Sequence, residues 1–255
     1  LLDKSQQSNR SSPKWITHIV VPLFNLFVAL MIAGIVIYFN GDDPIEALLL
    51  LIKGAFGNDE FIGFTLYYTT NFIFTGLAVS IAFHCGLFNI GGEGQAYIGG
   101  LGVGLVAIYL GHLSPFFVIP LCILAAVIFG ASWALIPAYL QAKRGSHIVI
   151  TTIMFNFLAA AVMTYLMVEV LIEPGQQAPQ SREFNNNSWL PFMHEIFNFF
   201  GIQISVSSLN FSFIIAIISS LLIWLFIWRT HWGYEIRTTG ANQKAAIYAG
   251  ISPSK

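Results

Sequence analysis

Charged side chains are scarce in this 255-residue chain. Asp, Glu, Lys and Arg make up 9% of it and hydrophobic residues 56%, whereas soluble domains carry about 25% charged residues. The net charge of −1 leaves no basic face that could neutralise the phosphates of a nucleic acid. The composition therefore predicts an integral membrane protein and excludes a nucleic-acid partner.

The chain also has few cysteines and lacks two common sequence motifs of enzymes. The two cysteines, Cys85 and Cys122, lie in apolar segments without metal-ligand spacing, and we interpret them as buried thiols. No Gly-Lys dipeptide occurs, so the phosphate loop of ATP-hydrolysing proteins is missing, and no His-Glu-x-x-His pair is present. We expect a protein that is not an enzyme, with no catalytic residue, no metal and no cofactor of its own.

Long apolar runs dominate what is present. A helix needs about 20 apolar residues to cross the hydrocarbon layer of a bilayer. Six runs reach or approach that length, at residues 15–39, 61–85, 96–111, 115–140, 148–172 and 211–228. Pro22, Pro120 and Pro137 should bend the helices that contain them, and a shorter helix is expected at 45–56. The predicted fold class is all-α: a polytopic transmembrane helix bundle of about six visible spans, with residues 15–228 as the transmembrane domain.

Basic residues alternate between the loops and set the expected orientation. Most of the eleven Lys and Arg residues lie in the segments 1–14, 141–147 and 229–255. By the positive-inside rule these three segments face the cytoplasm. The chain should thus consist of a cytoplasmic N-terminal segment, the membrane domain with a long outer loop at 173–210, and a cytoplasmic loop at its end. A weakly amphipathic helix is expected at 192–200.

A polar, glycine-rich stretch separates the second and third apolar runs. Residues 86–95, which we call the glycine-rich break, read Gly-Leu-Phe-Asn-Ile-Gly-Gly-Glu-Gly-Gln. Each glycine costs a helix interior about 1 kcal/mol relative to alanine, so a broken or loosely wound helix is predicted. Irregular backbone at membrane depth is tolerated where it is buried in protein or lines a water-filled cavity. A polar turn and a translocation path fit equally well. The path hypothesis names Asn89, Gly91, Gly92, Glu93 and Gln95.

A second polar strip enters the fifth apolar run after a basic turn. Thr152 and Asn156 lie four residues apart and therefore share a helix face. They could line a substrate path, or they could form the inter-helix hydrogen bonds that hydroxyls and amides commonly supply. We favour hydrogen bonding for Thr152 and the path for Asn156.

The third informative stretch is residues 231–251. Asn242 suits an N-cap, residues 243–249 a short helix, and Gly250 the residue after its end. Such a short helix is marginal in water and needs a surface to dock against. Its alanines would let another surface approach closely, and Tyr248 could act as an anchor. A turn at the membrane surface is the alternative.

Together these stretches resemble the permease subunits of ABC importers for branched-chain amino acids, ribose and nucleosides. The similarity is closest to the larger permease of nucleoside importers that use binding lipoproteins of the basic membrane protein type. It covers roughly residues 61–111, with the Gly-Leu-Phe-Asn-Ile-Gly motif, residues 141–156, with a basic turn before a Thr-Ile-Met-x-Asn helix, and residues 232–251, with the cytoplasmic coupling loop.

The resemblance implies a gate that couples to a separate ATPase, so that ATP binds to a partner. Its partners would be cytoplasmic ABC ATPase subunits, a second permease in a heterodimer, an extracytoplasmic substrate-binding lipoprotein and the lipid bilayer of a bacterial inner membrane, with the N-terminus in the cytoplasm. Family members continue through further spans, so we expect the fold to be C-terminally incomplete. The implied coupling residues are Glu235, Arg237, Gly240, Asn242, Ala245, Ala246, Tyr248 and Gly250.

The chain departs from the family motif at three positions. His84 and Cys85 stand where the family has Arg and a small residue, and Ile148 stands where it has Glu. These changes leave open whether the substrate is a nucleoside, ribose or a branched-chain amino acid. An ATP-independent secondary transporter is a further alternative, but it would be expected to show inverted repeats and a membrane carboxylate, for which Glu93 is the candidate. A shortened, inactive remnant is the last alternative.

Overall fold

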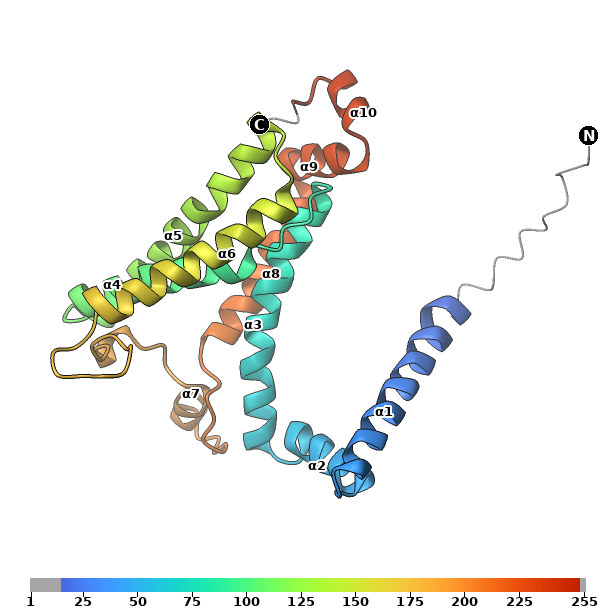
Figure 1. Ribbon diagram of the computed structural model, residues 1–255. Helices are drawn as coiled ribbons and strands as arrows, with labels where there is room; N and C mark the ends of the chain where they lie inside the picture. Colours follow the sequence, from blue (N-terminus) through green and yellow to red (C-terminus); the bar gives the residue numbers. More distant parts are fainter. Residues whose placement is uncertain (1–14, 253–255) are drawn as a thin grey trace, which may run out of the picture. The chain divides into compact units, whose positions relative to one another are not determined.

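The structure is a computed structural model that describes residues 15–252, so the predictions for residues 1–14 and for Lys255 lie outside it. Apart from two isolated β-bridges, the ordered elements of the described residues are helices. The predicted all-α class is confirmed (Figure 1). The long helices are α1 (Val21–Phe39), α3 (Asp59–His84), α4 (Gly92–Leu110), α5 (Pro115–Arg144), α6 (Ile148–Tyr165) and α8 (Ser212–Arg229). The shorter ones are α2 (Pro44–Phe56), α7 (Met193–Phe199), α9 (His231–Ala241) and α10 (Gln243–Tyr248).

The chain forms two compact units that divide after Ile62. In the first, α1 follows a π-helical turn, η1 (Ile16–Val20), in which the Val21 N–H donates to the Ile16 carbonyl. The wider turn lies directly before Pro22, whose ring would clash with a carbonyl one α-helical turn earlier. The α2 helix starts where predicted, because the Asp43 carboxylate accepts the Ile45 N–H at 2.8 Å.

The second unit, from Gly63 onward, is organised around α4. This helix packs along α5 and against α6, and it has more buried residues than any other helix described. Glycine makes the close approach possible: a Cβ at Gly102 would lie 2.9 Å from the Ala125 carbonyl oxygen. Small residues at helix crossings let two backbones pack closely inside a membrane.

Five helical segments among the described residues are long and apolar enough to cross a membrane. They are Ile16–Phe39, Asp59–His84, Pro115–Arg144, Ile148–Val170 and Ser212–Arg229. These match five of the six predicted spans, and α5 runs unbroken through Pro120 and Pro137. The sixth, α4, has 19 residues but is the exception, because glycines and a polar first turn replace apolar side chains along it. It packs against α5 and α6 on one side, while Tyr97, Tyr109 and Leu110 remain more than a third exposed on the other.

The predicted outer loop is folded onto the second unit. The side-chain amide of Asn187 donates to the Leu113 carbonyl at 3.1 Å, beside the turn between α4 and α5. A Cβ at Gly63, on α3, would overlap the buried hydroxyl of Ser207. The helix expected at 192–200 is α7, as predicted. The loop therefore covers the C-terminal end of α4 and the first turns of α3.

Candidate translocation and coupling site

The glycine-rich break separates α3 from α4, as predicted. Helix α3 ends at His84 and α4 begins at Gly92, so the last residues of the stretch form the first turn of α4. The Gln95 N–H donates to the Gly91 carbonyl at 3.0 Å, and the Asn89 side chain accepts the Gly91 N–H at 2.8 Å. Asn89 thus satisfies a backbone donor at the start of α4 that has no intrahelical partner.

Two side chains from α6 hold the break. The Asn156 amide oxygen accepts the Gly94 N–H at 2.9 Å, and its amide nitrogen donates to the Ile90 carbonyl at 2.9 Å. Thr152 is 1% exposed, and its hydroxyl oxygen accepts the Ile90 N–H at 3.3 Å. The shared helix face predicted for Thr152 and Asn156 exists and faces the break. Hydrogen bonding accounts for both residues, and the path role of Asn156 stays a prediction.

Two glycines of the break are required by this packing. A Cβ at Gly91 would lie 3.1 Å from the Cβ of Thr152, and one at Gly94 would lie 2.9 Å from the Asn156 amide oxygen. Both contacts are tighter than side chains ordinarily make, so a methyl group would push α6 away. Glycine here serves close approach rather than helix breaking alone.

The remaining path candidates divide into two groups. Asn89, Gln95 and Thr152 line a small cavity of about 130 Å³ among α3, α5, α6 and the break. A cavity of that size can hold a few water molecules, each of which occupies about 30 Å³ in the liquid. Gly92 has open space around it and Glu93 is exposed. Glu93 therefore does not line the polar cavity and lies on the exposed side of α4.

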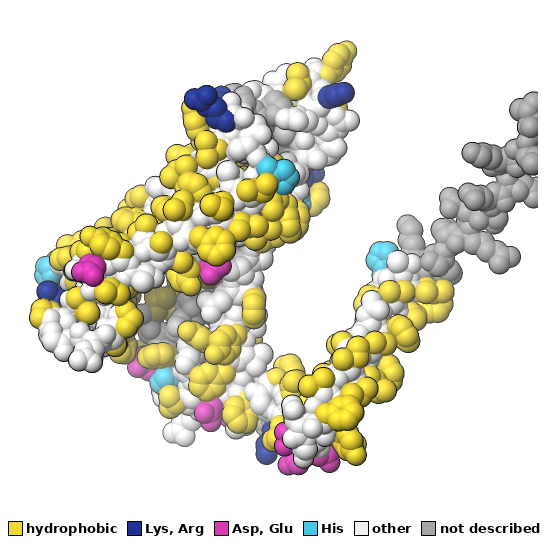
Figure 2. Space-filling model, in the orientation of Figure 1, with side chains coloured by type: hydrophobic (Ala, Val, Ile, Leu, Met, Phe, Trp, Pro, Cys, Tyr) yellow, Lys and Arg dark blue, Asp and Glu magenta, His cyan; other side chains and the backbone are white. Residues whose placement is uncertain are grey.

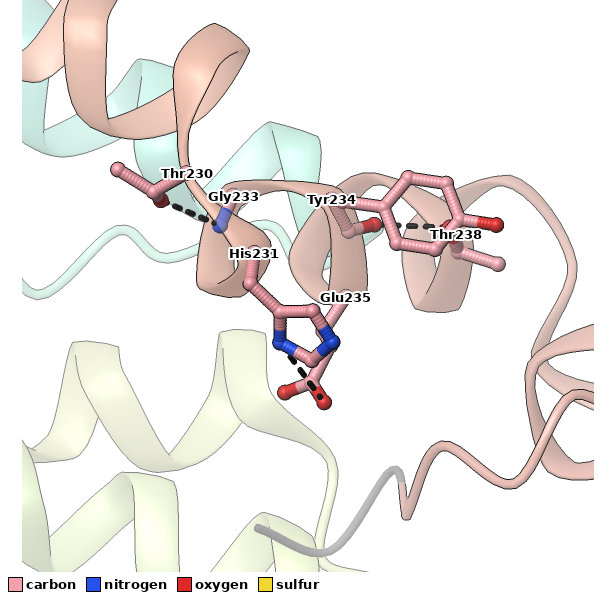
Figure 3. A network of polar contacts seen from close by, with 6 residues as sticks. All are labelled: Thr230, His231, Gly233, Tyr234, Glu235 and Thr238. Atoms are coloured by element: carbon pink, nitrogen blue, oxygen red, sulfur yellow. Dashed lines mark hydrogen bonds and ion pairs between the residues drawn. The ribbon is translucent and has the colours of Figure 1, made fainter.

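Helix α9 was not predicted, and it turns the chain at the end of α8. The Thr230 hydroxyl caps it by accepting the Gly233 N–H at 3.1 Å (Figure 3). His231, directly after Thr230, pairs with Glu235 one turn later, with His231 Nδ1 3.6 Å from Glu235 Oε1. The Thr238 hydroxyl donates to the Tyr234 carbonyl. The two glycines of α9 conceal it in the sequence, although the capping threonine and the i,i+4 pair are signals that could have revealed it.

Helix α10 forms with the predicted caps. The Asn242 side chain accepts the N–H groups of Lys244 and Ala245 at 3.0 and 3.1 Å, and Gly250 has φ +81° after the helix end. Tyr248 is 97% exposed, as an anchor for a partner would be.

Two predicted coupling residues contact other parts of the chain, and their coupling role stays a prediction. Ala246 is buried, so it cannot receive a partner surface directly. Arg237 lies over the Trp228 ring, 4.5 Å from its centre, and its Nε donates to the Ile227 carbonyl at 3.1 Å. Every residue of α10 other than Ala246 is exposed: Gln243, Lys244, Ala245, Ile247 and Tyr248.

Comparison of the sequence with known proteins finds one matching family model and several similar transporter permeases. The family model described as "Branched-chain amino acid transport system / permease component" matches residues 61–255. The guanosine ABC transporter permease protein NupP of Bacillus subtilis is 31% identical over 245 residues, which is 95% of this chain and 67% of the relative. The nucleoside ABC transporter permease protein NupB of Lactococcus lactis is 30% identical over 93% of this chain and 65% of the relative. The glucose ABC transporter permease protein TsgB13 of Haloferax volcanii is 29% identical over 95% and 63%.

The chain spans about two thirds of the length of these curated relatives. No solved structure matches it significantly.

Proposed function

The chain belongs to the family of permease components of the branched-chain amino acid transport system type, and from this premise we propose that it is the membrane-spanning permease subunit of an ATP-driven nucleoside importer. The observation that carries the proposal is α10, a short capped helix displayed beyond the end of α8 with Tyr248 almost fully exposed. So short a helix is marginal by itself. A cytoplasmic ATPase subunit is the surface against which it would dock.

The names of two relatives support nucleosides as the substrate, since one is named for guanosine and one for nucleosides. The relative named for glucose favours a sugar as the second candidate. A nucleoside carries a ribose, so the two candidates share a hydroxyl-rich ring.

In this function the break and the face of α4 that bears Glu93 would border the translocation path. Asn89, Gln95 and Thr152 would keep water and polar groups at the cytoplasmic end of that path, in the small cavity beside the break. Asn156 would hold the break in the arrangement described above, through its hydrogen bonds to Gly94 and Ile90. ATP would bind to the partner, whose association must favour one state of the permease over the other for transport to occur.

The further partners proposed are a second permease in a heterodimer and an extracytoplasmic substrate-binding lipoprotein. The location proposed is a bacterial inner membrane, with the N-terminus in the cytoplasm. The distribution of charge supports this orientation, because Lys and Arg side chains lie over the end of α5 and over α10, while hydrophobic side chains cover the long helices (Figure 2). Loops rich in Lys and Arg face the cytoplasm.

A pull-down in mild detergent tests the class. The full-length protein is isolated from its native membrane, and the proteins that accompany it are identified. A co-purifying ATPase with a phosphate loop supports the importer. A protein that is isolated alone and catalyses ion-dependent uptake in liposomes would instead be a secondary transporter.

Uptake by the assembled complex tests the substrate. Radiolabelled guanosine and glucose are offered separately to proteoliposomes that contain the permeases, the ATPase and the binding protein. ATP-dependent uptake of guanosine, undiminished by excess glucose, supports the nucleoside assignment. The reverse preference would replace it with the sugar.

A further inference from the structure

The glycine-rich break and α9 meet backbone against backbone. A Cβ at Gly86 would lie 3.1 Å from both the Cα and the carbonyl oxygen of Gly240. A Cβ at Gly240 would lie 2.7 Å from the Gly86 nitrogen and 2.8 Å from the Cys85 carbonyl carbon, and it would overlap the His84 carbonyl oxygen. Only two glycines permit this contact, and Gly86 also has φ +72°, which disfavours any side chain there.

Trp228, near the end of α8, closes the same junction from the side. Its ring meets the His84 ring edge to face, with centroids 5.9 Å apart. The Arg237 guanidinium lies over the Trp228 ring at 4.5 Å, which is within the range of a cation–π interaction. The ends of α3 and α8 and the middle of α9 are therefore fixed to one another.

The two sides of the junction lead to the two regions of the proposed mechanism. From Gly240 the chain continues through Asn242 into α10, which buries Ala246. From Gly86 it continues through the break to Ile90 and Gly94, which α6 holds. A contact between backbones has no side-chain rotamer that could absorb a displacement, and packed junctions switch between discrete arrangements rather than deforming.

We propose that the Gly86–Gly240 contact, held by Trp228, is the positioning element that transmits movement of α9 and α10 to the glycine-rich break. This inference rests on the proposed function, in which α10 docks on an ATPase. A purely static role is the alternative: the contact would then fix the helices equally in all nucleotide states. The two differ in whether the junction responds to ATP.

Cys85 offers a native probe of the junction. It lies between His84 and Gly86 and lines a pocket of about 580 Å³ with α9 residues that include Glu235 and Thr239. The chain has two cysteines, so the Cys122→Ala variant retains Cys85 as its one thiol. The rate of Cys85 alkylation by N-ethylmaleimide is measured in the complex with the ATPase, with and without adenylyl imidodiphosphate.

The expected result is a change of about fivefold in the alkylation rate when the ATP analogue binds, within the usual range of allosteric coupling. Equal rates in the two states, with the ATPase bound and hydrolysing ATP, would overturn the inference and leave the proposed function intact. Failure of the ATPase to bind the unmodified protein would overturn the proposed function, and the inference with it.

Gly240→Ala provides the second test. The added methyl would meet only backbone atoms, so α9 must move away from the break. The variant should still bind the ATPase and hydrolyse ATP, but guanosine uptake per ATP should fall about tenfold and the ATP-dependent change at Cys85 should disappear. Gly76→Ala on α3 is the matched control, since a Cβ there meets nothing within 4 Å.

Normal uptake per ATP and a normal Cys85 response in Gly240→Ala would refute a transmitting role. If Gly240→Ala does not reach the membrane, the Cys85 measurement with both glycines intact decides between the two roles.

Discussion

Replacing Asn156 by leucine should loosen the glycine-rich break. Leucine has a similar size but can neither accept the Gly94 N–H nor donate to the Ile90 carbonyl, which Asn156 bonds at 2.9 Å each. A typical hydrogen bond contributes about 0.5 to 1.5 kcal/mol net, so the two together contribute about 2 kcal/mol. For a chain of this size, each kcal/mol shifts Tm by about 2 to 4 °C. We therefore expect Tm to fall by about 5 °C.

The assay is thermal unfolding of the purified protein in mild detergent, with Thr164→Val as the matched control. Thr164 lies on the same helix, but its hydroxyl donates only within α6, to the Ala160 carbonyl. The control should keep its Tm within about 1 °C, because exposed substitutions away from such features change stability little. If Asn156→Leu and Thr164→Val have equal Tm values, Asn156 does not clamp the break and the assignment fails.

Three further variants test separately the translocation path, the packing of α10 and the docking of the ATPase. Glu93→Gln should insert normally but transport slowly, because Glu93 is the exposed ionisable residue of the break; wild-type guanosine uptake would remove it from the mechanism. Ala246→Trp places an indole ring where the buried Ala246 leaves no room, so the variant should have a lower Tm and should no longer bind the ATPase. A wild-type Tm would show that α10 accommodates the larger side chain. Tyr248→Ala, at a 97% exposed position, should leave Tm unchanged and weaken ATPase binding about tenfold; unchanged affinity would exclude Tyr248 as an anchor.

Local patterns in the sequence were sufficient to predict most elements of the fold. Apolar length predicted five of the membrane-spanning segments, and the side chain of Asn242 and the position of Gly250 predicted the caps of α10. These features depend on neighbouring residues only. The same reasoning missed α9, because glycines at 233 and 240 disfavour a helix unless something else requires them.

What the sequence alone could not provide were contacts between distant segments. The junction of Gly86 with Gly240 joins residues far apart in the chain, and both glycines had a local interpretation, as a helix breaker and as part of a loop. Likewise Ala246 fits a docking face by its size, but its burial depends on where α9 lies. A small residue at a helix surface permits close approach without indicating which surface approaches.

The departures from the family motif become interpretable once the cavity beside the break is known. Ile148, which stands where the family has Glu, lines that cavity together with Asn89, Gln95 and Thr152. A carboxylate in such a place needs a cation or several donors, because burying an unpaired charge is costly. The family's Arg at position 84 is absent too, and His84 packs against Trp228 instead. The two departures therefore lie at the same end of the helix bundle, with His84 against Trp228 and Ile148 in the cavity beside the break.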